Sequence, residues 1–174
     1  VEPLPSHNIF LACRPDHPLA GRRRLTASAV FSFPIASTPV LGDAVRALES
    51  AGDAAGKINP ETRDFVPAIH VNSQAIARQI AAGTDAIVPG SASMLADDIR
   101  SGRLVTIDFH TPLMRTHYGI VHHRHRTLSP PAQAFIECLR SVENEVVAAE
   151  ANAPPAARKG RRSRPDEPQS DFLD

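Results

Sequence analysis

The chain has 174 residues, of which 42% are hydrophobic, enough for one ordinary domain or two small lobes. Nineteen basic and nineteen acidic side chains give a formal net charge of +0, so no global field favours nucleic acid or an anionic membrane. The sequence contains no apolar stretch near the ~20 residues that a membrane helix requires. Cys13 and Cys138 lie in apolar runs, which predicts buried, reduced thiols of a cytosolic protein.

The predicted elements alternate between strands and helices. In the first half they are, in chain order, a buried strand over residues 8–13, a short helix over 27–31 after the N-cap Thr26, a strand over 33–37, a helix over 43–51 closed by Gly52, and an exposed loop over 51–63. In the second half they are a strand over 67–71, a helix capped by Asn72 or Ser73 that ends at Gly83, a short strand over 85–88 broken by Pro89-Gly90, a helix opened by Ser91 or Ser93 that stops at Gly102, and two strands over 103–108 and 117–122. This alternation is typical of an α/β fold with a parallel sheet and crossover helices.

The last predicted helix is the clearest. Ser129 is its N-cap, Pro130 follows near the first helical position, and one face carries Phe135, Cys138, Leu139, Val142 and Val146. Residues 151–174 are rich in Pro, Ala, Arg, Ser and Asp, which predicts a disordered tail. Five cations within residues 158–164 could contact phosphates, but the acidic residues that follow nearly cancel them, which favours a solvated segment.

Three strand-to-helix junctions carry small polar side chains: Ser37-Thr38-Pro39, Asn72-Ser73 and Pro89-Gly90-Ser91. In open α/β sheets, ligands bind beyond the carboxyl ends of the strands, where such junctions gather. Each helix start offers unpaired backbone N–H groups with a partial positive charge, so this rim suits a carboxylate, a phosphate or a sugar hydroxyl. The alternative is that Asn72, Ser73 and Ser91 are only N-caps, a role that selects the same residue types.

Other chemistries fit the sequence less well. The histidines that could suggest a metal site are His110, His117, His122, His123 and His125, but neighbouring strand residues face opposite ways and no carboxylate or cysteine completes a ligand set. The serines near Gly90 lack the G-x-S-x-G pattern of a nucleophile turn, and Asp16-His17 lies between prolines, as in a turn. With no phosphate-loop or dinucleotide glycine pattern, the sequence predicts no metal, no cofactor and no catalytic residue.

Three segments together resemble LysR-type transcriptional regulators. They are FLACRPDHPLAGRRRLTASAVFSFPI, VNSQAIARQIAAGTDAIVPGSASMLADDIRSGRLVTI and HYGIVHHRHRTLSPPAQAFIECLRSV. The first is similar to the hinge crossing of the family's effector-binding domain, the second to the glycine-containing block of its second lobe, and the third to its closing strand and helix. In unbroken order they span roughly residues 8–146.

The resemblance implies a two-lobed, type 2 periplasmic-binding-protein-like fold with an incomplete first lobe. Residues 1–24 would be the hinge strand and crossing from the first lobe, 25–115 the second lobe, 116–150 the return strand and C-terminal helix, and 151–174 the tail. The family's winged-helix DNA-binding domain and the opening of its first lobe have no counterpart in this sequence, so any DNA contact is expected through a domain outside it.

The resemblance also implies a function. A small polar or anionic inducer is expected between the lobes, with the second-lobe wall carried over as Ser37, Thr38, Asn72, Ser73, Val88, Pro89 and Gly90. The protein is then expected to be a cytoplasmic, non-enzymatic homodimer or homotetramer that does not contact a membrane. The alternative is a solute-binding protein of a transport system, which shares this fold.

One segment departs from the family pattern. Residues 83–86 read Gly-Thr-Asp-Ala, with polar groups where a glycine and an aliphatic residue usually stand. We expect this difference to alter the edge of the pocket.

Overall fold

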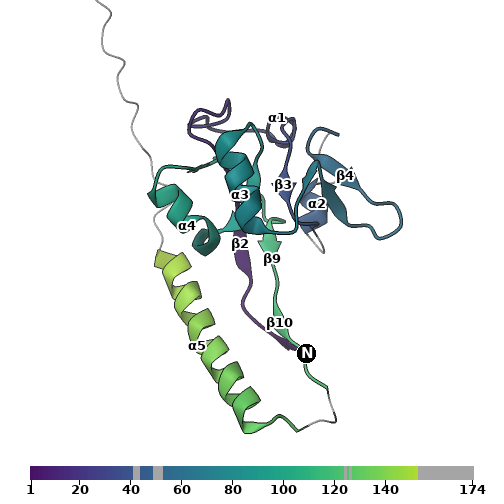
Figure 1. Ribbon diagram of the computed structural model, residues 1–174, viewed down its shortest axis with the longest axis vertical. Helices are drawn as coiled ribbons and strands as arrows, with labels where there is room; N and C mark the ends of the chain where they lie inside the picture. Colours follow the sequence, from purple (N-terminus) through teal and green to yellow (C-terminus); the bar gives the residue numbers. More distant parts are fainter. Residues whose placement is uncertain (41–43, 49–52, 124, 126, 153–174) are drawn as a thin grey trace, which may run out of the picture.

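The computed structural model describes residues 1–40, 44–48, 53–123, 125 and 127–152 (Figure 1). Its strands are β1 (Glu2–Pro3), β2 (His7–Cys13), β3 (Ala36–Ser37), β4 (Gly56–Ile58), β5 (Phe65–Pro67), β6 (Ile69–His70), β7 (Val88–Ser91), β8 (Val105–Thr106), β9 (Arg115–Thr116) and β10 (Gly119–Ile120). Its helices are α1 (Ala27–Val30), α2 (Ala44–Leu48), α3 (Gln74–Gly83), α4 (Ala92–Arg100) and α5 (Pro130–Asn152). The α/β class predicted from the sequence is confirmed.

Among the described residues the strands form one four-stranded and three two-stranded sheets of mixed direction, not a single parallel sheet. β3 and β6 pair in parallel, and a parallel bridge between Ile35 and Ile87 joins β3 to the segment that becomes β7. Strand β2, in contrast, pairs antiparallel with β7, β8 and β9. Parallel pairing is therefore confined to β3, β6 and the bridge at Ile87 among the described residues.

Strand β2 has a hydrophobic core on each of its faces. Leu11 and Cys13 belong to one buried cluster, and Ala12 belongs to a second cluster with residues of α3 and α4. Successive side chains of a strand point to opposite faces, which explains why neighbours on β2 enter different clusters. A strand covered on both faces reads as a continuous apolar run, as residues 8–13 do.

The segment predicted as an exposed loop, 51–63, is partly wrong. Residues 56–58 form β4, which pairs antiparallel with β5, and Ala55 is fully buried. Asn59 turns the chain, because its side-chain Oδ1 accepts hydrogen bonds from the N–H groups of Glu61 and Thr62. Small and polar residues thus build a hairpin through local side-chain to backbone bonds. The predicted helix over 43–51 is observed as α2, and its predicted ends, Asp43 and residues 49–52, lie outside the described residues.

The strand predicted over 85–88 is also misplaced. Pro89-Gly90 do not break it, because β7 runs through both residues and pairs them with Leu11 and Phe10 of β2. Proline can occupy a strand where its missing N–H is not needed for pairing. The strands predicted over 103–108 and 117–122 are shorter in the structure, where the chain forms β8, β9 and β10.

Helix α5 begins as predicted, but part of its apolar face is exposed, with Leu139 and Val146 half-buried. The Ser129 side chain accepts a hydrogen bond from the N–H of Ala132 at 3.4 Å, whereas Phe135 is 68% and Val142 57% exposed. Cys138 is exposed as well, so the prediction of two buried thiols holds only for Cys13. The helix continues to Asn152, and the rest of the predicted tail, 153–174, lies outside the described residues.

No helix in the described part of the chain is both long and apolar enough to span a bilayer.

Candidate ligand-binding edge of the sheet

Two of the three predicted junctions lie at one edge of the sheet. The parallel register places Ser37 opposite His70, so Ser37-Thr38 and Asn72-Ser73 follow adjacent strands at their carboxyl ends. Because Ile35 bridges to Ile87 in parallel, Val88 reaches the same edge.

Pro89 and Gly90 differ from the prediction. They lie inside β7, which runs on past the end of β3 along β2. These two residues therefore flank the edge as part of a strand and do not form a loop over it.

Gln74, which the sequence prediction missed, connects two of these junctions. Its Nε2 donates to Ser37 Oγ at 3.2 Å and to Thr38 Oγ1 at 3.4 Å. The available signal was its position, since it is the first helical residue after Asn72-Ser73. Ser37 is 2% exposed, and Gln74 lies against its hydroxyl.

Gln74 also carries an unsatisfied group. Its Oε1 is buried without a hydrogen-bond partner among the described residues. Burying an unpaired polar atom costs about 1–3 kcal/mol, and such atoms are uncommon in native structures. Because Oε1 is an acceptor, a group that donates an N–H or O–H is needed to satisfy it.

The N-terminus of α3 adds donors to this edge. The first intrahelical bond runs from the N–H of Ala77 to the carbonyl of Ser73, so the N–H groups of residues 74–76 have no intrahelical partner. The side chains predicted for the edge are hydroxyl, amide or apolar groups without charge. The edge can therefore bind an acceptor oxygen through neutral donors and the partial positive charge of the helix end.

The structure shows which of Ser73 and Ser91 acts as a helix N-cap through its side chain. Ser91 Oγ accepts a hydrogen bond from the N–H of Met94 at 3.3 Å and so caps α4. Ser73 occupies the cap position of α3 but makes no side-chain cap bond. Helix capping accounts for Ser91 and does not account for the hydroxyl of Ser73.

A stability comparison checks this difference. Ser91→Ala is expected to lower the free energy of unfolding by about 1 kcal/mol, because a cap bond is lost. Ser73→Ala is expected to cost only a few tenths of a kcal/mol, because it removes no such bond. Urea denaturation of both variants measures the two values, and equal losses would contradict the assignment.

The polar departure at residues 84–85 lies at the opposite end of the strands. Asp85 accepts a hydrogen bond from Arg14 at 2.8 Å, and the Thr84 hydroxyl donates to the carbonyl of Ile80. Both residues come before Ile87 along this strand, whereas the candidate edge lies at the end of the strand that comes after Ile87. These residues join the loop after β2 to the end of α3, away from the candidate edge.

The histidines give no metal site in the part of the chain that the structure describes, where no group of three or more His, Cys, Asp or Glu residues could hold a metal ion. His17 closes a turn, as the flanking prolines indicated: its Nδ1 accepts from the N–H of Leu19, and its Nε2 lies 3.1 Å from the carbonyl of Asp85.

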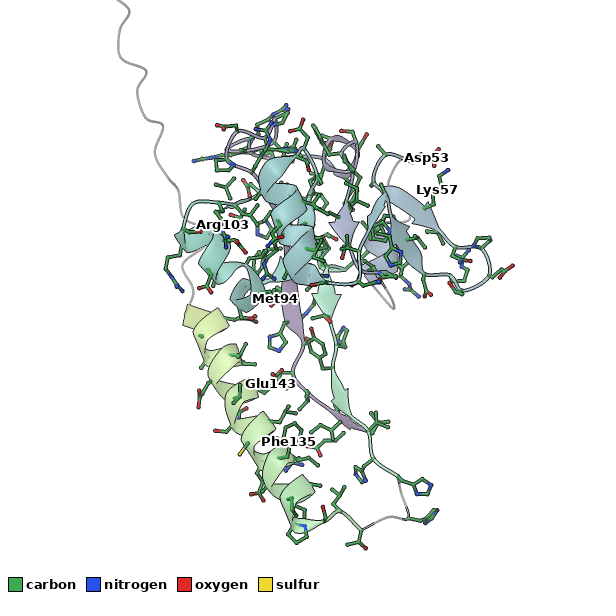
Figure 2. All side chains as sticks on the ribbon, viewed as in Figure 1. Asp53, Lys57, Met94, Arg103, Phe135 and Glu143 are labelled. Carbon is green, nitrogen blue, oxygen red and sulfur yellow. The ribbon has the colours of Figure 1, made fainter. Side chains whose placement is uncertain are left out.

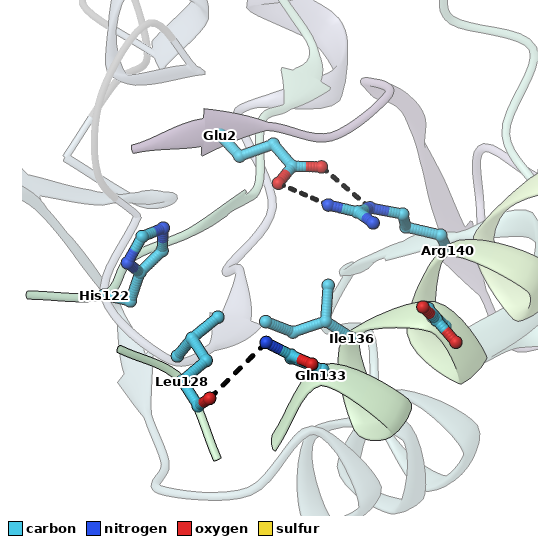
Figure 3. Close-up of a pocket in the computed structure, with 7 residues that line it drawn as sticks. Glu2, His122, Leu128, Gln133, Ile136 and Arg140 are labelled. Atoms are coloured by element: carbon cyan, nitrogen blue, oxygen red, sulfur yellow. Dashed lines mark hydrogen bonds and ion pairs between the residues drawn. The ribbon is translucent and has the colours of Figure 1, made fainter. Parts of the chain in front are cut away.

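A depression lies away from this edge, between β1 and α5 (Figure 3). It has a volume of about 200 Å³ and is lined by Glu2, His122, Leu128, Gln133, Ile136, Glu137 and Arg140. Glu2 and Arg140 form a two-bond ion pair at 2.7 and 2.8 Å, and the hydrogen bond from Arg140 lowers the pKa of Glu2. Because these charges satisfy each other and the volume is below the ~300 Å³ of typical ligand pockets, we favour the sheet edge as the ligand site.

Comparisons with known proteins agree with this architecture. The family model of the LysR substrate binding domain matches residues 1–144. A curated relative from a Pseudomonas species, the SDS degradation transcriptional activation protein, is 32% identical over 139 residues, which cover 78% of this chain and 42% of the relative. The chain thus spans less than half the length of that protein.

Two solved structures share the fold. The regulatory domain of Synechocystis CcmR in complex with 2-PG superposes with a TM-score of 0.58 at 20% identity, covering 82% of this chain and 65% of that one. Hydrogen-peroxide-bound Corynebacterium glutamicum OxyR, a mutant form, gives a TM-score of 0.58 at 19% identity, covering 86% of this chain and 46% of that one.

Strand order, junction placement and these similarities define a ligand-binding domain of the type 2 periplasmic-binding-protein-like class. The chain belongs to the LysR substrate-binding domain family.

Proposed function

We propose that this chain is the effector-sensing module of a LysR-type transcription regulator. Family membership and the regulatory role in the curated relative's name support this proposal over a solute-binding protein for transport. The observation that carries the site is the convergence of Ser37, Thr38 and the α3 N-terminus around Gln74, whose Oε1 lacks a partner. The effector is a small polar or anionic metabolite.

Within this proposal the edge forms the second-lobe wall of the effector site. Residues 25–115 are the second lobe, and residues 1–24 and 116–150 belong to the first. The wall consists of Ser37, Thr38, Asn72, Ser73, Val88, Pro89 and Gly90, to which we add Gln74. The module binds ligand without catalysis, in a cytoplasmic homodimer or homotetramer whose DNA contacts come from a domain outside this chain.

The mechanism is a shift in the population of lobe arrangements. A ligand that contacts both lobes stabilises the arrangement it binds more tightly. The difference in its binding free energy between the two arrangements sets how strongly ligand binding is coupled to the DNA-binding domains. Gln74 takes part because an O–H or N–H of the ligand can donate to its Oε1, which has no partner among the described residues.

Effector binding is tested by calorimetric titration of the intact protein with a metabolite panel. The panel includes a sulfate ester, in view of the curated relative's name, together with 2-PG and simple carboxylates. We expect Ser73→Val, Asn72→Leu and Gln74→Leu each to weaken binding about tenfold or more, the equivalent of losing roughly 1.4 kcal/mol of hydrogen bonding.

The matched control is Thr62→Val, a similar exchange of a polar group in the β4–β5 turn, which lies outside the edge. It is expected to leave the affinity unchanged. Unchanged affinity in all three edge variants would remove the proposed site.

A further inference from the structure

His7 on β2 is buried although it is an ionisable residue. It is 4% exposed and pairs in register with Thr116 of β9. Two carboxylates of α5 approach its ring from opposite sides: Glu143 Oε1 lies 2.5 Å from Nε2, and Glu150 Oε2 lies 2.9 Å from Nδ1. Glu143, labelled in Figure 2, and Glu150 are seven residues apart, about two helical turns, and so share one face of α5.

This geometry fits a protonated imidazole. A neutral histidine has a single N–H and can donate to only one of the two carboxylates, whereas the imidazolium ion donates to both. The hydrogen bond to Glu143, followed by that to Glu150, raises the pKa of His7 against the opposing effect of burial. The other Glu150 oxygen, Oε1, is buried without a hydrogen-bond partner among the described residues, so removing the positive charge would leave this carboxylate poorly compensated.

On the β9–β10 side, no described residue forms a competing ion pair with the His7 ring. The Tyr118 ring lies 6.1 Å away, centroid to centroid. Arg115 of β9 donates instead to the Ser6 hydroxyl at 2.6 Å and to the Ser6 carbonyl. The two glutamates of α5 therefore dominate the electrostatics of His7.

Ion pairs contribute to the attachment of α5. Arg140 of this helix also pairs with Glu2, and both of these side chains are more than 40% exposed. The apolar residues Phe135 and Val142 face solvent. Figure 1 shows that β2 and the β9–β10 segment connect the main body to the part that contains α5, and His7 lies on this connection.

We propose that His7 is a pH-responsive latch that fixes α5 against strand β2. The protonated ring bridges Glu143 and Glu150 and holds the helix in one position. Loss of the proton breaks one bridge, leaves adjacent carboxylates uncompensated, and frees α5 to move relative to the body. The latch acts on the helix position directly and does not depend on the proposed effector site.

The direction of the pH dependence follows from the raised pKa. The folded-state pKa of His7 lies above the ordinary value of 6.5, so the stabilisation is fully present below pH 6.5. It is lost as the pH rises through the folded-state pKa. Docking of α5 is therefore expected at mildly acidic pH and release at alkaline pH.

The test measures the distance between spin labels on α5 and on the body in the full chain. Cys138 is exposed and accepts one label, and Lys57→Cys on β4 supplies the second site. Cys13 is buried with its thiol pKa raised to about 12 by burial, and it stays unlabelled. We expect one narrow distance distribution at about pH 5.5 that broadens by about pH 9, on either side of a raised histidine pKa.

Three variants decide the outcome. His7→Gln and the pair Glu143→Gln with Glu150→Gln should give the broad distribution at both pH values. NMR titration of the glutamine pair should show that the pKa of His7 has moved back toward 6.5. His110→Gln, a change at an exposed histidine of the body, should keep the wild-type response. If His7→Gln prevents folding, the glutamine pair still tests the latch, because both substitutions lie on α5. A distance unaffected by pH in the wild type, or a pH response that persists in the glutamine pair, would overturn the proposal.

Discussion

Phe65→Ala is expected to lower the free energy of unfolding by about 3–5 kcal/mol, the usual cost of removing a buried phenylalanine ring. Phe65 is 1% exposed and belongs to the larger core cluster, which also includes Phe31 and Ile35. Its backbone pairs with Val40 in both directions at 3.0 Å. Those bonds remain in the variant, so the measured loss reports the cavity and the lost apolar contacts.

Phe135→Ala is the matched control, because it removes the same ring from a site that is 68% exposed on α5. A surface change of this kind is expected to stay within about 0.5 kcal/mol. Urea denaturation of both variants gives the comparison. Similar losses at the two positions would show that the apolar face of α5 is covered in solution, or that Phe65 is not in the core.

Asp98→Ala is expected to cost about 2–3 kcal/mol, since it removes charge-assisted hydrogen bonds from a buried carboxylate. The side chain of Asp98 is 8% exposed and bonds to Arg78 of α3 at 2.8 Å and to Arg103 at 2.5 Å. It thereby joins α3 and α4 to the chain that leads into β8. Arg78 and Arg103 are partly exposed, so water can satisfy them in the variant, which keeps the loss below that of a fully buried ion pair.

The adjacent residue provides the control for this prediction. Asp97 pairs with Arg100, but both side chains are more than 75% exposed, and exposed pairs contribute about 0.2–1 kcal/mol. Asp97→Ala should therefore cost little, and added salt should abolish its effect. Equal losses for the two variants in thermal denaturation would contradict the assigned role of Asp98.

The candidate site was predictable where local rules apply. Asn72 and Ser73 precede a helix of amphipathic spacing, so this junction followed from the sequence. The junction at Ser37-Thr38 likewise followed from the β-rich run before it. For Gln74 the sequence offered only its position at the start of the helix, because its bonds to Ser37 and Thr38 cross 36 or more positions of the chain. Likewise, no local rule indicates that Pro89 and Gly90 lie in a strand beside β2.

The sequence by itself determined the α/β class, most helix starts and the family, because apolar spacing, N-caps and ordered family segments are local properties of the chain. Only the tertiary structure decided the strand directions, the β4–β5 hairpin, the exposure of Cys138 and the pairing of His7 with α5. These features depend on which distant segments pack together. His7 lies just before the predicted strand over 8–13, and nothing in its neighbourhood along the chain indicates its role, because its two carboxylate partners come from a helix more than 130 positions away.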